Sequence, residues 1–295
     1  MNFTGEHLKV RDDPVIIGAV GGSGTRVFKR AVELAGYFVG TYVNTNKDAV
    51  PLRMFFRSWS HQWLKLYEQS IAGLSSSVAI QKMREEFYRA VDRHLSGLPE
   101  LSSPWGFKVP KSLLFLQFLQ WIYPKMKFIH VIRNGLDMVY SRNWRVRFNS
   151  EGVLEKEEQK LPEYLQRILY WSRVNDIASK YAKKHLGENY IRIRFEDMCA
   201  TPENVIQRLL DFLNISNKYN LDAAVSEIGL PNSVGRWRNH PTEEIFEIMK
   251  VGRPGLEHFG YWNPNIWQKM DSVMHGPNWR RWVFQRVDMK RMPAW

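Results

Sequence analysis

A short glycine-rich stretch, Gly21 to Arg26, offers the clearest chemistry in this sequence. It reads Gly-Gly-Ser-Gly-Thr-Arg and directly follows the apolar run from Val15 to Val20, which is typical of a strand buried on both faces of a parallel sheet. Where such a turn leads into a helix, the first backbone N–H groups of the helix lack helical partners, and glycines let an anion approach them closely. The stretch therefore predicts an anion-binding loop, with a tight structural turn as the alternative.

This loop matches neither of two common nucleotide-binding motifs. Gly24 is followed by Thr25 and Arg26, whereas the Walker motif requires Lys and then Ser or Thr after its last glycine. The dinucleotide motif, started at Gly22, requires Gly or Ala where Val27 stands. The identity of the anion must therefore come from other segments.

The charge of the chain favours anionic partners. The 295 residues include 42 Lys and Arg against 30 Asp and Glu, which gives a formal net charge of +12. Nucleic acid, a membrane surface, a nucleotide and a sulfated or phosphorylated small molecule all satisfy such a charge. Net charge alone does not choose among them.

The single cysteine, Cys199, excludes an internal disulfide and a cysteine-based zinc site, and it fits a reducing compartment. The start of the chain, Met1 to Asp13, is polar rather than a signal sequence. No apolar run reaches the ~20 residues of a transmembrane helix. We therefore expect a cytoplasmic protein without a transmembrane segment.

Strands and helices alternate along the chain and must position the loop. The expected strands are 15–20, 128–132 and 190–195, with an extended segment at 105–108, and the expected helices are 27–35, 51–70, 78–95, 111–122, 162–185 and 202–213, with another from 136 onward. This order predicts an α/β fold of three layers, α/β/α, with a central parallel sheet. Ligands then bind beyond the carboxyl ends of the strands, where Gly21 to Arg26, Arg133 and Glu196 lie. We expect one domain over residues 1–295, with loops and short helices in its proline-rich part from about residue 221.

Four segments occur in the order and spacing of one known enzyme family. Val20 to Arg26 is similar to a loop that holds a 5'-phosphosulfate, and Phe128 to Ser141 is similar to a segment whose arginine and serine grip a 3'-phosphate. Arg194 to Met198, with Pro202, resembles a strand-end pattern whose aromatic residue packs near an adenine, and Val234 to His240 resembles a late segment that closes over the cofactor. Together these segments resemble the sulfotransferases that use 3'-phosphoadenosine 5'-phosphosulfate (PAPS).

The resemblance implies a set of cofactor-binding residues and no metal requirement. The product would be adenosine 3',5'-bisphosphate. For Arg133 the alternative is a surface ion pair, and for Phe195 it is ordinary core packing. The implied cofactor-binding residues are Gly22, Ser23, Gly24, Thr25, Arg26, Arg133, Ser141, Phe195, Arg236, Trp237 and Arg238.

One departure from the family pattern concerns catalysis. Cytosolic members carry a loop lysine where Gly22 stands, so Arg26 or Lys108 would have to supply its charge. Lys108 also stands where those members place a catalytic histidine, which makes the chain more similar to carbohydrate-type and bacterial-type branches. Branches without the histidine use a carboxylate from the loop after the first helix, and Asp48 is the only carboxylate there. We expect Asp48 to be the base, with a solvated turn aspartate as the alternative for that residue. His61 is the next candidate base, and Lys108 is a further one.

The sequence thus predicts transfer of a sulfuryl group from PAPS to an acceptor hydroxyl, by in-line attack with a carboxylate base. The acceptor is a small molecule or a carbohydrate, and the sequence identifies neither it nor the oligomeric state. A nucleotide-dependent kinase is one alternative, but it needs a magnesium site and a loop lysine. A basic nucleic-acid-binding protein is another, if the aromatic residues from Trp262 to Trp295 form a stacking surface. We expect no nucleic-acid partner.

Overall fold

The computed structural model describes residues 10–66, 77–142, 152–215, 225 and 228–275. The chain forms two compact units, and each unit contains two segments of the sequence. The first unit comprises Met1–Ile132 and Ile177–Gly229, and the second comprises Arg133–Asp176 and Leu230–Trp295. The single-domain organisation stays a prediction.

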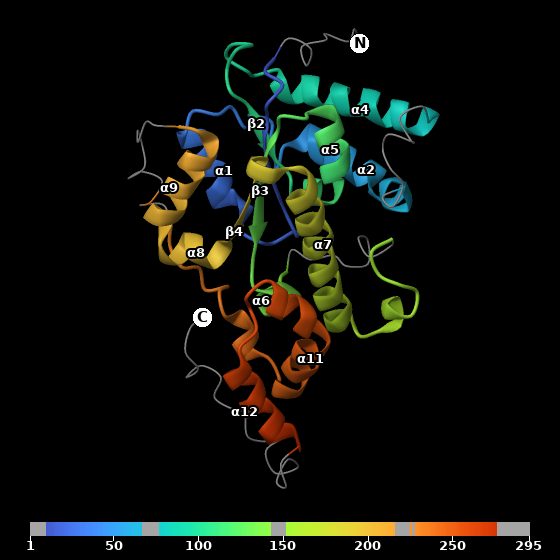
Figure 1. Ribbon diagram of the computed structural model, residues 1–295, viewed down its shortest axis with the longest axis vertical. Coiled ribbons are helices and arrows are strands. Elements are labelled where there is room, and N and C mark those ends of the chain that lie inside the picture. Colours follow the sequence, from blue (N-terminus) through green and yellow to red (C-terminus); the bar gives the residue numbers. More distant parts are fainter. Residues whose placement is uncertain (1–9, 67–76, 143–151, 216–224, 226–227, 276–295) are drawn as a thin grey trace. The chain divides into compact units, whose positions relative to one another are not determined.

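The first unit is built on a parallel sheet of four strands (Figure 1). The strands are β1 (Val15–Ala19), β2 (Gly106–Lys108), β3 (Lys127–Ile132) and β4 (Tyr190–Arg194), in the order β2-β1-β3-β4. β1 is buried along its whole length and pairs with both β2 and β3, so that Ile16 lies opposite Phe107 and Phe128. This central position explains the uninterrupted apolar run that precedes the glycine-rich loop.

Helices cover both faces of this sheet, which confirms the predicted three-layer α/β fold (Figure 1). One layer contains α1 (Thr25–Leu34), α8 (Phe195–Ala200) and α9 (Pro202–Leu213). The other contains α2 (Val50–Leu66), α4 (Val78–Leu95) and α5 (Leu116–Ile122), with the 3-10 helix η2 (Pro110–Phe115) leading into α5. A short 3-10 helix, η5 (Gly187–Asn189), precedes β4.

An aromatic core lies under α2 and α4. Phe55 packs against Phe87 at 5.1 Å between ring centroids, and Phe56 packs against Phe115 at 4.9 Å. Trp63 is fully buried, and its indole N–H donates a hydrogen bond to the carbonyl of Leu114. These aromatic side chains therefore form part of the hydrophobic core of the first unit.

The second unit contains mostly helices. They are α6 (Gly135–Val139), the 3-10 helices η4 (Glu158–Lys160) and η6 (Arg236–Asn239), α11 (Thr242–His258), α12 (Pro264–His275) and the first part of α7 (Glu163–His185), which continues into the first unit after Asp176. Trp171 of α7 is fully buried and packs edge-on against Phe259 and Tyr261. This cluster forms the centre of the unit.

The expectation of loops and short helices beyond residue 221 is wrong for the described residues of that part. α11 has 17 residues and α12 has 12. Pro241 and Pro264 stand at helix starts, where proline is favourable, and Pro254 lies inside α11. An interior proline costs ~3 kcal/mol, and burial of apolar residues at helical spacing, such as Ile245, Met249 and Leu256, offsets this cost.

The ends of other predicted strands and helices differ less from those in the structure. β4 ends at Arg194, and Phe195, which we expected to end this strand, begins α8. The helix expected at 111–122 is a 3-10 helix followed by an α-helix. No helix in the described part of the chain is both long and apolar enough to cross a membrane.

Candidate functional site

The glycine-rich loop connects β1 to α1 in the first unit, as predicted. Gly24 is the residue before α1 and has a left-handed backbone (φ 83°), which favours glycine. The Ser23 hydroxyl donates a hydrogen bond of 2.7 Å to the carbonyl of Val20 and so closes the turn. No acidic residue occupies the first turn of α1, all of which the structure describes. This helix start is therefore suited to an anion.

Phe195 packs against the loop. A Cβ atom at Gly24 would overlap the Phe195 ring, so the glycine is needed for this close approach as well as for its backbone angle. Phe195 is buried at the start of α8. The structure thus brings Phe195 to the loop, while a role beside an adenine stays a prediction.

A group of cations surrounds this end of the sheet. Lys108 ends β2 and lies beside β1, where it pairs in register with Ile17. Burial lowers the pKa of the Lys108 ammonium, and the charges of Lys29 and Arg26 lower it further, while Asp48 opposes these effects. Lys29, buried on α1 and paired with Glu33, was not identified from the sequence. Lys29 lies four residues, about one helical turn, after Thr25 at the start of α1, so both side chains lie on one face of the helix. This spacing is the sequence signal that could have identified Lys29.

The structure joins Asp48 and Lys108, two residues that the sequence analysis named separately. The Lys108 ammonium donates hydrogen bonds of 2.5 Å to Asp48 Oδ1 and 2.6 Å to the carbonyl of Asn46. Both side chains are largely buried, with 1% of the Lys108 side chain and 11% of the Asp48 side chain exposed. Asp48 is therefore not a solvated turn residue.

Asn44 organises the loop that carries Asp48. Its Oδ1 accepts hydrogen bonds of 2.9 Å from the backbone N–H groups of Asn46 and Asp48, and its Nδ2 donates one of 3.2 Å to Asp48 Oδ2. Both carboxylate oxygens of Asp48 are thereby held in place. His61, the other candidate base, is exposed on α2, eleven residues beyond Val50 and ~16 Å along the helix.

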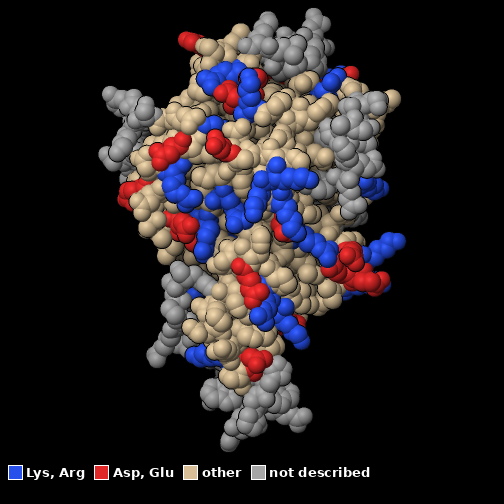
Figure 2. Space-filling view, viewed as in Figure 1, with Lys and Arg blue, Asp and Glu red and all other residues tan. Residues whose placement is uncertain are grey.

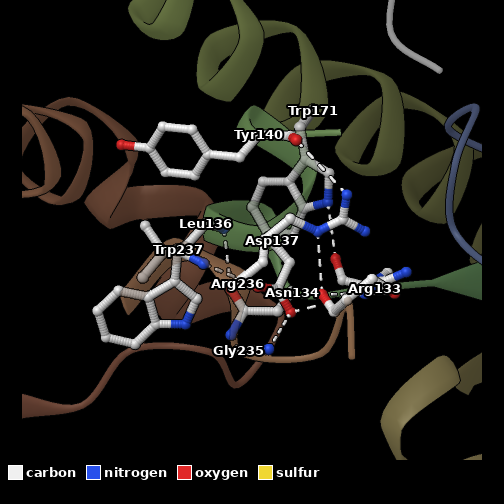
Figure 3. Close-up of polar contacts among 10 residues, drawn as sticks. Arg133, Asn134, Leu136, Asp137, Tyr140, Trp171, Gly235, Arg236 and Trp237 are labelled. Carbon is white, nitrogen blue, oxygen red and sulfur yellow. Dashed lines mark hydrogen bonds and ion pairs between the residues drawn. The ribbon is translucent and has the colours of Figure 1, made fainter. Parts of the chain in front are cut away.

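Arg133 begins the second unit, immediately after β3. Its guanidinium donates hydrogen bonds of 2.5 and 3.0 Å to the carbonyl and hydroxyl oxygens of Ser233, and the Trp171 indole donates to the Arg133 carbonyl (Figure 3). Arg133 is 3% exposed, so it is not a surface ion pair. Ser141, also buried, follows the five-residue helix α6, so the two predicted phosphate ligands flank one short helix.

Asp137 is a site residue that sequence reasoning missed. It lies on α6, and its carboxylate accepts hydrogen bonds of 2.8 Å from the Gly235 N–H and 3.3 Å from the Trp237 N–H (Figure 3). Burial raises its pKa, while these hydrogen bonds and the charge of Arg133, at 3.8 Å, oppose the rise. An acidic residue one helical turn after Arg133 is the signal that could have found it.

The segment from Val234 to His240, which the sequence predicted to close over the cofactor, is therefore attached to α6 through Asp137. Arg236 donates hydrogen bonds to the carbonyls of Ser233 and Tyr140, at 3.0 and 3.4 Å (Figure 3). Trp237 is fully buried, and the Arg238 guanidinium stacks 4.6 Å from its ring centroid. Trp237 therefore holds the segment in place, and a direct contact of these three residues with cofactor stays a prediction.

Charged side chains are abundant on the surface. Figure 2 shows that Lys and Arg side chains gather on the face in view, with Asp and Glu among them. Within the described residues, no group of three or more His, Cys, Asp and Glu side chains is placed to hold a metal ion.

Comparisons with known proteins bear on the family and the fold of the chain. A family model described as "Sulfotransferase family" matches residues 37–219, a range that includes Asp48, Lys108, Arg133 and Ser141. A comparison with curated proteins found no match.

Among solved structures, sulfotransferase STF9 from Mycobacterium avium has a TM-score of 0.51 at 12% identity, over 87% of this chain and 79% of that chain. The sulfotransferase domain of the Synechococcus PCC 7002 olefin synthase has a TM-score of 0.50 at 14% identity, over 86% of this chain and 98% of that one. At these identities the structures show a shared fold. The family model matches more than half of the sequence, and the chain therefore belongs to the sulfotransferase family.

Proposed function

We propose that this sulfotransferase takes its sulfuryl group from PAPS and transfers it to an acceptor hydroxyl, with Asp48 as the base. The observation that carries the proposal is the buried pair of Asp48 and Lys108 at the end of β2, beside the strand that leads into the anion-binding loop. A base and a cation are what transfer of a sulfuryl group between oxygen atoms requires.

The residues of the loop fit the 5' end of the donor. The N-terminus of α1 presents backbone N–H groups, and the positive φ of Gly24 lets an anion approach them. Arg26, Lys29 and Lys108 supply positive charge at the same end of the sheet. When bound, PAPS would supply an activated sulfuryl group with a phosphate as its leaving group.

The resemblance to the family assigns the 3'-phosphate to Arg133 and Ser141. A guanidinium binds a phosphate through two parallel N–H donors. In Arg133 one guanidinium nitrogen, Nη2, donates to both the carbonyl and the hydroxyl oxygen of Ser233. Asp137, which lies near this guanidinium, and Trp171, which binds the Arg133 carbonyl, keep the residue in position.

Asp48 is held for proton transfer. Lys108 binds Oδ1 closely, whereas Oδ2 accepts the longer hydrogen bond from Asn44. We assign Oδ2 to take the proton of the acceptor hydroxyl. Lys108 remains available to stabilise negative charge that develops during transfer.

Ligand-induced thermal stabilisation tests the donor. Adenosine 3',5'-bisphosphate should raise the melting temperature without magnesium, and neither MgATP nor a random oligonucleotide should do so. Arg133→Ala should remove the shift, whereas Arg253→Ala, which removes an exposed arginine of α11, should keep it. The absence of a shift with the bisphosphate would refute the proposal. Transfer of labelled sulfate from PAPS across a panel of acceptor classes then tests the reaction.

A further inference from the structure

Arg53 of α2 lies beside Asp48, and Arg57 follows it one helical turn further along the helix. Arg53 and Arg57 are one helical turn apart and exposed, so their side chains share one face of the helix. The Arg53 Nε atom lies 3.8 Å from Asp48 Oδ2, the oxygen assigned to accept the proton. A molecule whose hydroxyl reaches Asp48 therefore meets the Arg53 guanidinium, and Arg57 lies one helical turn beyond it.

A third cation joins them from η2. The Lys111 ammonium donates a hydrogen bond of 3.4 Å to the Ser60 hydroxyl of α2. Burial lowers the pKa of Lys111 to about 8, and the charges of Arg57 and Arg53 add to the effect. Three like charges interact here, which is unfavourable in the free protein and is relieved when an anion binds.

Two large apolar side chains are exposed near the start of α2. Tyr42 is 64% exposed and Met54 is 62% exposed. The Tyr42 carbonyl accepts a hydrogen bond from the Val50 N–H, which places Tyr42 at the start of α2, and Met54 follows Arg53 on that helix. Such side chains suit the flat apolar face of a sugar or aromatic ring.

We propose that Arg53, Arg57, Lys111, Tyr42 and Met54 form the acceptor site and that the acceptor carries a fixed negative charge, a carboxylate, sulfate or phosphate, close to the hydroxyl that is sulfated. This inference rests on the proposed function, because it takes Asp48 as the base. Arg53 and Arg57 bind the anionic group, Lys111 adds to the positive potential, and Tyr42 packs on the ring. A neutral acceptor would bring no negative charge to this group of cations.

Matched acceptor pairs test the proposal. Each pair differs only in the anionic group: a glucuronate-containing tetrasaccharide and its carboxyl-reduced form, 4-hydroxyphenylacetate and its amide, and a hydroxy fatty acid and its amide. Calorimetry measures their binding to the protein saturated with adenosine 3',5'-bisphosphate, and release of the bisphosphate from PAPS measures turnover. We expect the charged member of at least one pair to bind about tenfold more tightly than its neutral partner, the ratio that one additional favourable contact gives.

Variants then locate the anion. Arg57→Gln and Lys111→Gln should each raise the KM of the charged acceptor about tenfold, leave kcat and the KM of PAPS unchanged, and not lower the melting temperature. Arg57→Lys should restore part of the loss. Arg89→Gln, which removes a charge from the exposed face of α4, is the matched control and should change nothing.

The outcomes separate this inference from the proposed function. If no charged member binds more tightly than its neutral partner, whether both bind equally or neither binds, the anionic acceptor is wrong. The same holds if Arg89→Gln reduces binding as much as Arg57→Gln. If the protein does not bind the bisphosphate at all, the proposed function itself fails.

Discussion

The Lys108 ammonium lies 2.5 Å from Asp48 Oδ1 in an almost fully buried ion pair. The pair joins residues 60 positions apart, because β2 ends where the loop after α1 turns into α2. The backbone contributes as well, since the Ala49 N–H donates a hydrogen bond to the Lys108 carbonyl. The proposed base is therefore fixed to the sheet.

Replacing Asp48 by Asn should abolish turnover and preserve donor binding. The amide keeps the size of the side chain and can still accept a hydrogen bond from Lys108, but it cannot take a proton from the acceptor. Loss of a general base lowers kcat by a factor of roughly 10² to 10⁴. Turnover of labelled PAPS and the thermal shift with adenosine 3',5'-bisphosphate measure the two effects. A variant with a normal rate would exclude Asp48 as the base.

A double variant controls for stability in that experiment. Asp48→Asn leaves Lys108 buried without its counter-charge, and breaking a buried pair costs roughly 3–5 kcal/mol. Asp48→Asn combined with Lys108→Met should recover part of this free energy of unfolding in urea, because no buried charge remains. Activity should stay absent. If stability returned and activity returned with it, the loss in the single variant would be structural.

Much of the fold was predictable from the sequence, because buried strands and amphipathic helices have strong patterns. The helix expected at residues 78–95 is α4 with the same bounds, and β1 and β3 each differ by one residue at one end. α11 was not predicted because the many prolines beyond residue 221 indicated loops and short helices, whereas burial of its apolar residues keeps this helix intact around Pro254. Whether packing outweighs the weak helix propensity of a residue depends on the tertiary structure, which the local sequence does not show.

The candidate site was predictable only in part. Asp48, Lys108 and Arg133 could be named from motifs, but their contacts could not. Asp137 binds the Gly235 N–H across 98 residues, and no local pattern shows which backbone groups a carboxylate will meet. The residue types at strand ends indicate which chemistry a site can perform. The hydrogen-bond partners of those residues depend on how distant parts of the chain fold together.

Asp137→Ala should destabilise the protein by roughly 3–5 kcal/mol, because it removes a buried carboxylate that holds two backbone N–H groups and lies near Arg133. Asp137→Asn keeps one acceptor oxygen and should cost less. Urea unfolding measures the free energies, and hydrogen exchange should show lost protection at the Gly235 and Trp237 amides. Glu257→Ala, which breaks an exposed ion pair on α11, is the control. Unchanged exchange at both amides would contradict the role.

Gly24→Ala should impair both stability and binding of adenosine 3',5'-bisphosphate. Alanine at φ 83° costs ~1 kcal/mol in backbone strain, and its Cβ would also overlap the Phe195 ring. Gly21→Ala is the matched control for stability, because no described atom lies within 4 Å of a Cβ there. Thermal unfolding with and without the bisphosphate measures both effects. Equal behaviour of the two variants would show that Gly24 is not required in the loop.

His94 should make the protein less stable in mild acid. Its ring is fully buried on α4, Nε2 donates a hydrogen bond of 2.8 Å to the Gly106 carbonyl, and a Cβ at Gly40 would overlap it. Burial lowers the pKa of His94 to about 4, the Gly106 carbonyl opposes this change, and the charge of Lys29 adds to it. The folded protein therefore keeps the ring neutral in a range where the unfolded chain, with a pKa near 6.5, binds a proton.

The pH window follows from these two pKa values. Above pH ~6.5 the ring is neutral in both states, so its full contribution to stability is present. As the pH falls toward 4 the unfolded chain takes up the proton first, and the free energy of unfolding should decrease by about 3 kcal/mol, the product of the pKa difference and 1.36 kcal/mol per unit. Urea unfolding between pH 7 and 4 should therefore show a steeper loss for the wild type than for His94→Gln. The exposed His258→Gln variant should follow the wild type, and identical slopes for wild type and His94→Gln would contradict a neutral buried ring.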